Sequence, residues 1–151
     1  MSAAASSIHA GATAKHAPVL LHEVMAALGL RDGGLYVDGT FGAGGYTRAM
    51  LDGANARVIG IDRDPAAVAT GRAFAGVGTD RVRWVVGCFG DMGDLVPPVL
   101  GGWGRDGVDG ITLDLGVSSM QLDEAARGFS FRFDGPLDMR MDAGTSGAPS
   151  A

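Results

Sequence analysis

The glycine-rich stretch VDGTFGAGGYTRAM, residues 37–50, contains four glycines and an aspartate between a strand-like and a helix-like sequence. The apolar run at residues 35–39 is bounded by glycines, as a buried strand often is, and residues 46–51 have helix-forming character. A loop that joins a first strand to its helix lies at the carboxyl end of a parallel sheet, where such folds bind nucleotide-like ligands. Gly42, Gly44 and Gly45 would let backbone N–H groups approach a ligand that a Cβ atom would hold off.

The spacing of the glycines differs from that of a dinucleotide-binding fingerprint. The pattern is G-x-x-G-x-G-G, because Thr47 occupies the position of the third glycine in G-x-G-x-x-G, so a pyrophosphate fits poorly. Asp62 ends the next apolar run eighteen residues after Gly44, where an acidic side chain would accept hydrogen bonds from ribose hydroxyls. The loop and Asp62 together predict an adenosine ligand without a long phosphate tail. The alternative is that the glycines only form turns.

Strand-like and helix-like segments alternate along the chain, which predicts an α/β fold with a doubly wound parallel sheet. Residues 20–28 have the apolar spacing of a buried helix face, and Asp64 followed by Pro65 is typical of a helix N-terminus. The predicted strands are residues 35–39, 57–62, 82–87 and 107–116.

Two segments fit this alternation less well. Residues 91–104 should form a helix by position, yet Pro97 and Pro98 predict only a short or broken one. From Gly116 onward no clean periodicity remains and charges alternate with aromatics, which indicates a long functional loop.

Composition narrows the class of protein. A length of 151 residues fits one domain, and the net charge of −5 without a run of Lys or Arg argues mildly against nucleic-acid binding. The single cysteine, Cys88, excludes an internal disulfide framework and fits a reducing cytoplasm, where we expect the protein to be.

Residues 1–15 are expected to be a disordered tail rather than a signal peptide, and residues 143–151 a linker or a cut end. No stretch approaches the apolar length of a membrane span, so we expect no membrane partner.

Several longer stretches carry a resemblance to a known family. The chain contains, in this order, HAPVLLHEV, YVDGTFGAGGYTRAML, IGIDRDPAA, GITLDLGVSSMQLDEAARGFSFRFDGPLDMRMD and SGAPSA. In sequence and spacing they resemble the RsmH (MraW) family of bacterial 16S rRNA cytosine-N4 methyltransferases. The resemblance implies a Rossmann-like, S-adenosylmethionine-dependent methyltransferase domain, whose N-terminal part would be residues 16–142. The family is roughly twice this long, so its inserted helical domain and remaining strands are expected to be missing here.

The resemblance also implies a function and a set of site residues. The function would be N4-methylation of a cytidine in the decoding centre of 16S rRNA, with the small ribosomal subunit rather than DNA as the partner. The sequence carries no sign of oligomeric state. Beside Gly42 of the loop, the implied cofactor contacts are Gly44, Gly45, Tyr46, Asp62, Phe89, Asp114 and Gln121.

These side chains also have plainer interpretations. Asp62 could cap a turn, Phe89 could be core packing, Asp114 could only hold the loop and Gln121 could be solvated. The sequence departs from many family members at two positions, with Tyr46 in place of histidine in GGH and Met120 in place of proline in SSPQ.

The chemistry requires groups that make cytosine N4 a better nucleophile. Acceptors for its amino protons would localise the lone pair, and the residues expected to supply them are Asp114, Ser118 and Ser119. Residues 127–140 could contact RNA through interleaved arginines and phenylalanines. The aspartates among those arginines make an internal, salt-bridged loop an equal alternative.

Two other functions remain open at this point. The acidic charge favours a methyltransferase for a small molecule, although the block RGFSFRFDGPLDMRMD weighs against it. The second alternative is a non-catalytic fragment that binds S-adenosylmethionine. In the family's strand order the fourth strand pairs with a fifth, so we expect an exposed apolar edge here and a poorly soluble or molten chain unless that edge is covered.

Overall fold

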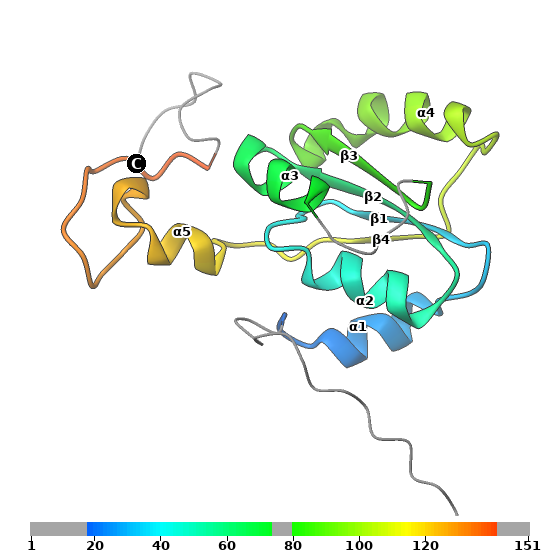
Figure 1. Ribbon diagram of the computed structural model, residues 1–151, viewed down its shortest axis with the longest axis horizontal. Helices are drawn as coiled ribbons and strands as arrows, with labels where there is room; N and C mark the ends of the chain where they lie inside the picture. Colours follow the sequence, from blue (N-terminus) through cyan, green and yellow to red (C-terminus); the bar gives the residue numbers. More distant parts are fainter. Residues whose placement is uncertain (1–17, 74–79, 142–151) are drawn as a thin grey trace, which may run out of the picture.

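The computed structural model describes residues 18–73 and 80–141, and within them it contains a four-stranded parallel sheet (Figure 1). The strand order is β3-β2-β1-β4, which places the reversal of a Rossmann-like fold between β1 and β4. Each strand lies within one of the four segments predicted to form strands, which confirms that prediction. The strands are β1 (Leu35–Asp38), β2 (Arg57–Asp62), β3 (Val82–Val86) and β4 (Gly110–Thr112). The expected tail at residues 1–15 and linker at residues 143–151 lie outside the described residues.

Helices cover both faces of the sheet (Figure 1). Helices α1 (Leu21–Leu28) and α2 (Gly45–Gly53) pack on one face, and α4 (Met92–Gly102) packs on the other. Helix α3 (Pro65–Arg72) lies against β2 and β3. The predicted start of α3 is confirmed, because the Asp64 side chain accepts a hydrogen bond from the Ala66 N–H at 2.9 Å.

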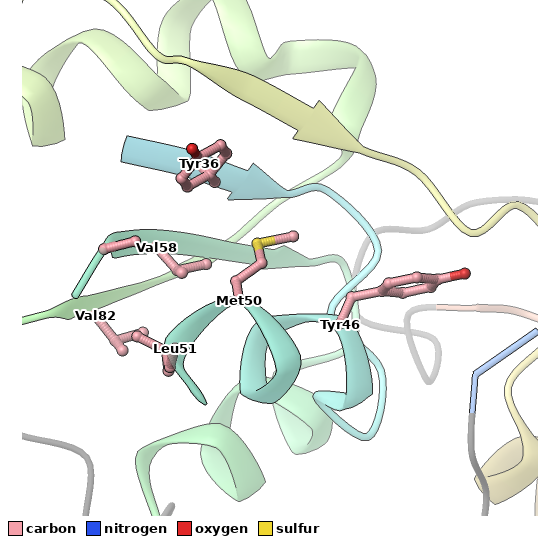
Figure 2. Close-up of a cluster of buried hydrophobic side chains, with 7 residues drawn as sticks. Tyr36, Tyr46, Met50, Leu51, Val58 and Val82 are labelled. Atoms are coloured by element: carbon pink, nitrogen blue, oxygen red, sulfur yellow. The ribbon is translucent and has the colours of Figure 1, made fainter. Parts of the chain in front are cut away.

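The strands supply an apolar cluster to each face. Figure 2 shows Met50 of α2 pointing toward Tyr36 of β1 and Val58 of β2, in the cluster that α1 also covers. The opposite cluster consists of Leu35, Val37, Ile59, Ile61, Val96 and Leu100. Because successive side chains of a strand point to opposite faces, a parallel strand buried on both sides needs the continuous apolar run that the sequence shows.

The prediction of a short or broken helix around the two prolines was wrong. Helix α4 runs without interruption over eleven residues and contains both Pro97 and Pro98. A proline inside a helix costs roughly 3 kcal/mol, whereas burying a side chain such as Val96 or Leu100 contributes about 1.5–3 kcal/mol each. Both of these residues are buried against the sheet, and the partly buried Met92, Leu95 and Val99 of the same helix pack beside them, so the packing of the whole face offsets the cost of the two prolines.

The segment after β4 is mostly irregular, as predicted, but it contains two short helical elements, α5 (Ser119–Asp123) and η2 (Ala125–Arg127). In Figure 1 it extends from the end of β4 toward the side of α3. Gly128 has a φ of +75°, and a Cβ there would lie 2.6 Å from the carbonyl oxygen of Asp138. The segment therefore folds back on itself with close backbone contact. We refer to residues 118–141 as the C-terminal segment.

Candidate functional site

The glycine loop lies where β1 ends, beside the reversal of strand order. Gly42 and Gly44 have φ values of +52° and +79°, which side chains rarely adopt. The loop is joined to the neighbouring strand because the Phe41 N–H donates to the Ile61 carbonyl at 2.9 Å. The backbone of these glycines is therefore held at the carboxyl end of the sheet, as the sequence predicted.

The buried carboxylate of Asp38, at the end of β1, holds this loop through hydrogen bonds. Its Oδ2 accepts hydrogen bonds from the Thr47 N–H at 3.1 Å and the Thr47 hydroxyl at 2.7 Å, and its Oδ1 accepts from the Thr40 N–H at 3.4 Å. Burial raises the pKa of Asp38 from 3.8 to about 6, against the opposing effect of the hydrogen bonds from Thr47. Asp38 thus ties the start of the loop and the first turn of α2 to β1.

Asp62 at the end of β2 contacts the same loop. Its Oδ2 accepts from the Gly42 N–H at 2.7 Å, and its Oδ1 accepts from the Asp64 N–H at 2.9 Å. Two backbone donors therefore fix the orientation of the carboxylate. Each oxygen keeps a second lone pair with which it can accept a hydrogen bond from a ligand.

Phe89 reaches the same end of the sheet although it follows the outer strand β3. It begins η1 (Phe89–Asp91), and its side chain is 37% exposed. A Cβ placed on Gly39 would lie 3.4 Å from the Cβ of Phe89 and 2.6 Å from Cδ2 of Leu113. The glycine at this position therefore lets two apolar side chains approach the end of β1.

Asp114 approaches from the other side of β1. Its N–H donates to the Thr40 hydroxyl at 2.7 Å, and the Gly39 N–H donates to the Thr112 carbonyl at 2.9 Å. The side chain of Asp114 is exposed. The glycine loop, Asp62, Phe89 and Asp114 thus meet at one end of the sheet.

The structure shows a packing role for Tyr46 and Gly45. Tyr46 is buried, its ring points away from Val58 and Val82 in Figure 2, and its hydroxyl donates to the Val19 carbonyl. Burial raises the pKa of Tyr46, with smaller contributions from the Asp114 and Asp38 carboxylates. Gly45 lies against the ring of Pro18, which leaves no room for a Cβ. Whether either residue contacts a cofactor stays a prediction.

Ser118 and Gln121 contact each other at the start of α5. The Ser118 hydroxyl accepts from the Gln121 N–H at 3.2 Å, and the Gln121 side-chain oxygen accepts from the Ser118 N–H at 2.8 Å. This reciprocal pair is a capping box, for which S-x-x-Q is the sequence signature. Gln121 is 7% exposed and its Nε2 also lies 3.3 Å from the sulfur of Met141. The side chain of Ser119 is outside what the structure describes.

Comparison with known proteins identifies the family of the chain. The model of the MraW methylase family matches residues 13–150. The chain belongs to this family. It is 58% identical over 126 residues to the ribosomal RNA small subunit methyltransferase H of Parvibaculum lavamentivorans, which covers 83% of this chain and 36% of the relative. The protein of the same name from Gluconobacter oxydans is 54% identical over 145 residues, or 95% of this chain and 41% of the relative. The chain thus spans about two fifths of the length of these relatives.

Sequence reasoning missed two residues that organise the site of this MraW family member. Thr40 joins the loop to Asp114, and Asp38 joins the loop to α2. Asp38 could have been found, because an aspartate in an otherwise apolar buried strand requires hydrogen-bond donors nearby. Thr40 gave no comparable signal, since threonine is common in loops.

The structure favours the salt-bridged interpretation of residues 127–140 in this MraW family member. Arg127 pairs with Asp64, and Arg140 pairs with Asp138. Of the phenylalanines, Phe129 is buried while Phe131 and Phe133 are exposed. The two arginines therefore serve internal contacts in this structure, and RNA contact by the exposed rings stays a prediction.

The described residues form neither a cluster of metal ligands nor a membrane-spanning helix. Within residues 18–73 and 80–141, no group of three or more His, Cys, Asp or Glu side chains is arranged to hold a metal ion. In the same ranges, no helix has the length and apolar character needed to cross a membrane.

Proposed function

We propose that this chain forms the S-adenosylmethionine-binding part of an rRNA methyltransferase, with N4 of a cytidine in the decoding centre of 16S rRNA as the methyl acceptor. The observation that carries the proposal is the meeting of Gly42, Asp62, Phe89 and Asp114 at the reversal of strand order. The names of the relatives support the rRNA substrate, since each is a ribosomal RNA small subunit methyltransferase.

The residues present fit the cofactor. The carboxylate of Asp62 is preset by two backbone donors and retains acceptor capacity for ribose hydroxyls. The partly exposed ring of Phe89 offers a face for the adenine. Gly42 and Gly44 carry no side chain that would fill the space above the loop. The remaining proposed contacts are Gly45, Tyr46, Asp114 and Gln121.

The chain's own contribution to the reaction would be to place and polarise the acceptor amine. When bound, S-adenosylmethionine supplies an electrophilic methyl group on sulfur. Asp114 has its backbone fixed by Thr40 and its side chain exposed, so the carboxylate can accept a hydrogen bond from N4. Ser118 and Ser119, in the turn after β4, are the further proposed acceptors, although the Ser118 hydroxyl already caps α5.

One observation favours a second candidate. Because the chain spans about two fifths of the length of its relatives, the second candidate is a cofactor-binding unit that does not methylate RNA by itself. Such a unit would bind S-adenosylmethionine and transfer no methyl group to small ribosomal subunits. A methylation assay with small ribosomal subunits that lack the modification separates the two candidates.

The direct test is calorimetric titration of S-adenosylmethionine into the chain. We expect saturable binding that Asp62→Ala weakens at least about tenfold, because charged hydrogen bonds of about 1.5–3 kcal/mol each are lost. Asp62→Asn, which keeps an acceptor for the loop, should weaken binding less. Asp52→Ala removes an exposed carboxylate on α2 and serves as the matched control. Absence of binding by the folded, unsubstituted chain, or equal binding by the Asp62→Ala variant, would contradict the proposal.

A further inference from the structure

A buried ion pair joins the C-terminal segment to the turn that carries Asp62. The Nη1 of Arg127 donates to Oδ2 of Asp64 at 2.6 Å, and the two side chains are only 13% and 8% exposed. Removing one partner of such a pair destabilises the protein, because the remaining charge is buried without a counter-charge. The contact therefore constrains where the segment lies.

Asp64 makes three contacts at once. Its Oδ1 caps α3 through the Ala66 N–H, its Oδ2 accepts from Arg127, and its own N–H donates to Oδ1 of Asp62 at 2.9 Å. Asp62 in turn accepts from the Gly42 N–H. A continuous series of hydrogen bonds thus leads from Arg127 to the glycine loop.

Arg127 also organises the segment to which it belongs. Its Nη2 donates to the carbonyl oxygens of Arg140 at 3.3 Å and Met141 at 3.0 Å. Arg127 is the last residue of η2, directly before Gly128, where the chain packs tightly on residues 136–138. One guanidinium therefore holds residues 140–141, at the end of the folded-back segment, and attaches them to the N-terminus of α3.

We propose that Arg127 is a positioning residue for the cofactor site: its pair with Asp64 holds the C-terminal segment against the turn that orients Asp62, so that binding of S-adenosylmethionine and ordering of the segment favour each other. The inference rests on the proposed function, because it assumes that Asp62 binds the cofactor. Coupling between two sites is reciprocal, so an anchor that improves cofactor affinity must itself be strengthened by the cofactor.

The test combines calorimetry with hydrogen exchange on the 151-residue chain. Arg127→Met keeps an unbranched side chain that replaces the aliphatic stem of the arginine and removes the guanidinium with its charge. Asp64→Asn keeps an N-cap and removes the charge of the partner, and Arg132→Met is the matched control on an exposed arginine of the same segment. We expect Arg127→Met to weaken S-adenosylmethionine binding about tenfold. It should also increase amide exchange across residues 118–141 without ligand, and abolish the extra protection that the cofactor gives there. Arg132→Met should leave all three unchanged.

A double substitution shows whether the two residues act as a pair. Asp64→Asn combined with Arg127→Met should weaken binding no more than the stronger single substitution does. Full additivity, or unchanged cofactor affinity in Arg127→Met despite faster exchange, would overturn the proposal. If the unsubstituted chain binds no S-adenosylmethionine, the proposed function fails and the coupling fails with it. The exchange comparison without ligand would still show whether Arg127 anchors the segment.

Discussion

Asp38 of β1 accepts two hydrogen bonds from Thr47 of α2, one from the backbone N–H and one from the hydroxyl, in a place where the carboxylate is buried. Thr47 is the third residue of its helix, so its N–H has no partner within the helix. Asp38 satisfies this donor and brings the glycine loop against the sheet. The same burial opposes ionisation of Asp38, so the contact stabilises the protein to a degree that depends on pH.

We predict that Asp38 lowers the stability of the protein as pH rises. Its pKa of about 6 in the folded chain exceeds the value of 3.8 expected when unfolded, so the folded state binds more protons between these values. The contribution is fully present below about pH 4 and is lost as pH rises through 6, by roughly 3 kcal/mol in total. Denaturant unfolding from pH 4 to pH 7 should show this loss in the unsubstituted chain and not in Asp38→Asn. If the free energy of unfolding of Asp38→Asn still fell between pH 4 and pH 7, the loss would come from another group. The control Asp52→Asn should lose stability as the unsubstituted chain does.

Gly42 is predicted to be intolerant of any side chain. Its φ of +52° is unfavourable for L-residues, so Gly42→Ala should lower the free energy of unfolding by roughly 1–2 kcal/mol. It should also weaken S-adenosylmethionine binding, because the N–H that orients Asp62 would shift. Gly101 in α4 is the matched control: a Cβ there meets nothing within 4 Å, so Gly101→Ala should stabilise the chain by about 0.5–1 kcal/mol. Thermal unfolding and calorimetry measure both quantities, and equal stability changes in the two variants would contradict the argument.

The capping box predicts which substitutions of Gln121 the start of α5 tolerates. Glutamate can replace glutamine as the N3 partner of a serine cap, whereas alanine cannot. Gln121→Ala should therefore destabilise α5 locally by about 1 kcal/mol, and Gln121→Glu should not. Hydrogen exchange at residues 119–123 measures the difference. Faster exchange in both variants would show that the contact of Nε2 with Met141 matters more than the cap.

Asp109 is predicted to stabilise the amino ends of β1 and β4. It accepts from the Leu35 N–H at 2.8 Å and pairs with Arg31 and Arg105. The hydrogen bond from Leu35, with the two arginines, holds the pKa of Asp109 below its usual value, so its contribution is present above about pH 4 and is lost as pH falls further. Asp109→Ala should cost about 1–3 kcal/mol near neutral pH, because the buried Leu35 N–H loses its acceptor. Urea unfolding measures this, and an Asp106→Ala control should show little change.

The sequence predicted the strands and the place of the glycine loop because these follow from local patterns. Apolar runs such as residues 57–62 are long enough to be recognised, and Asp64 before Pro65 marks a helix start whatever surrounds it. Helix α4 was mispredicted because its formation depends on burial of Val96 and Leu100 against the sheet. The sequence around the two prolines does not show that burial. The roles of Thr40 and Arg127 depend on partners more than sixty residues away, Asp114 and Asp64, and no local pattern reports such contacts.

The outer edge of β4 is predicted to promote association between copies of the chain. Within the described residues no strand pairs with the side of β4 that faces away from β1, and Ile111 on β4 is 48% exposed. An apolar edge with unpaired backbone groups pairs readily with other chains, so the isolated chain should associate in a concentration-dependent way. Ile111→Lys should raise the monomeric fraction in sedimentation or light scattering, because a charge at the edge opposes strand pairing. Val19→Lys, which removes an exposed apolar side chain outside the sheet, is the matched control. If both variants gain equally, general surface hydrophobicity rather than the β4 edge causes the association; a monomeric unsubstituted chain at high concentration would refute the prediction outright.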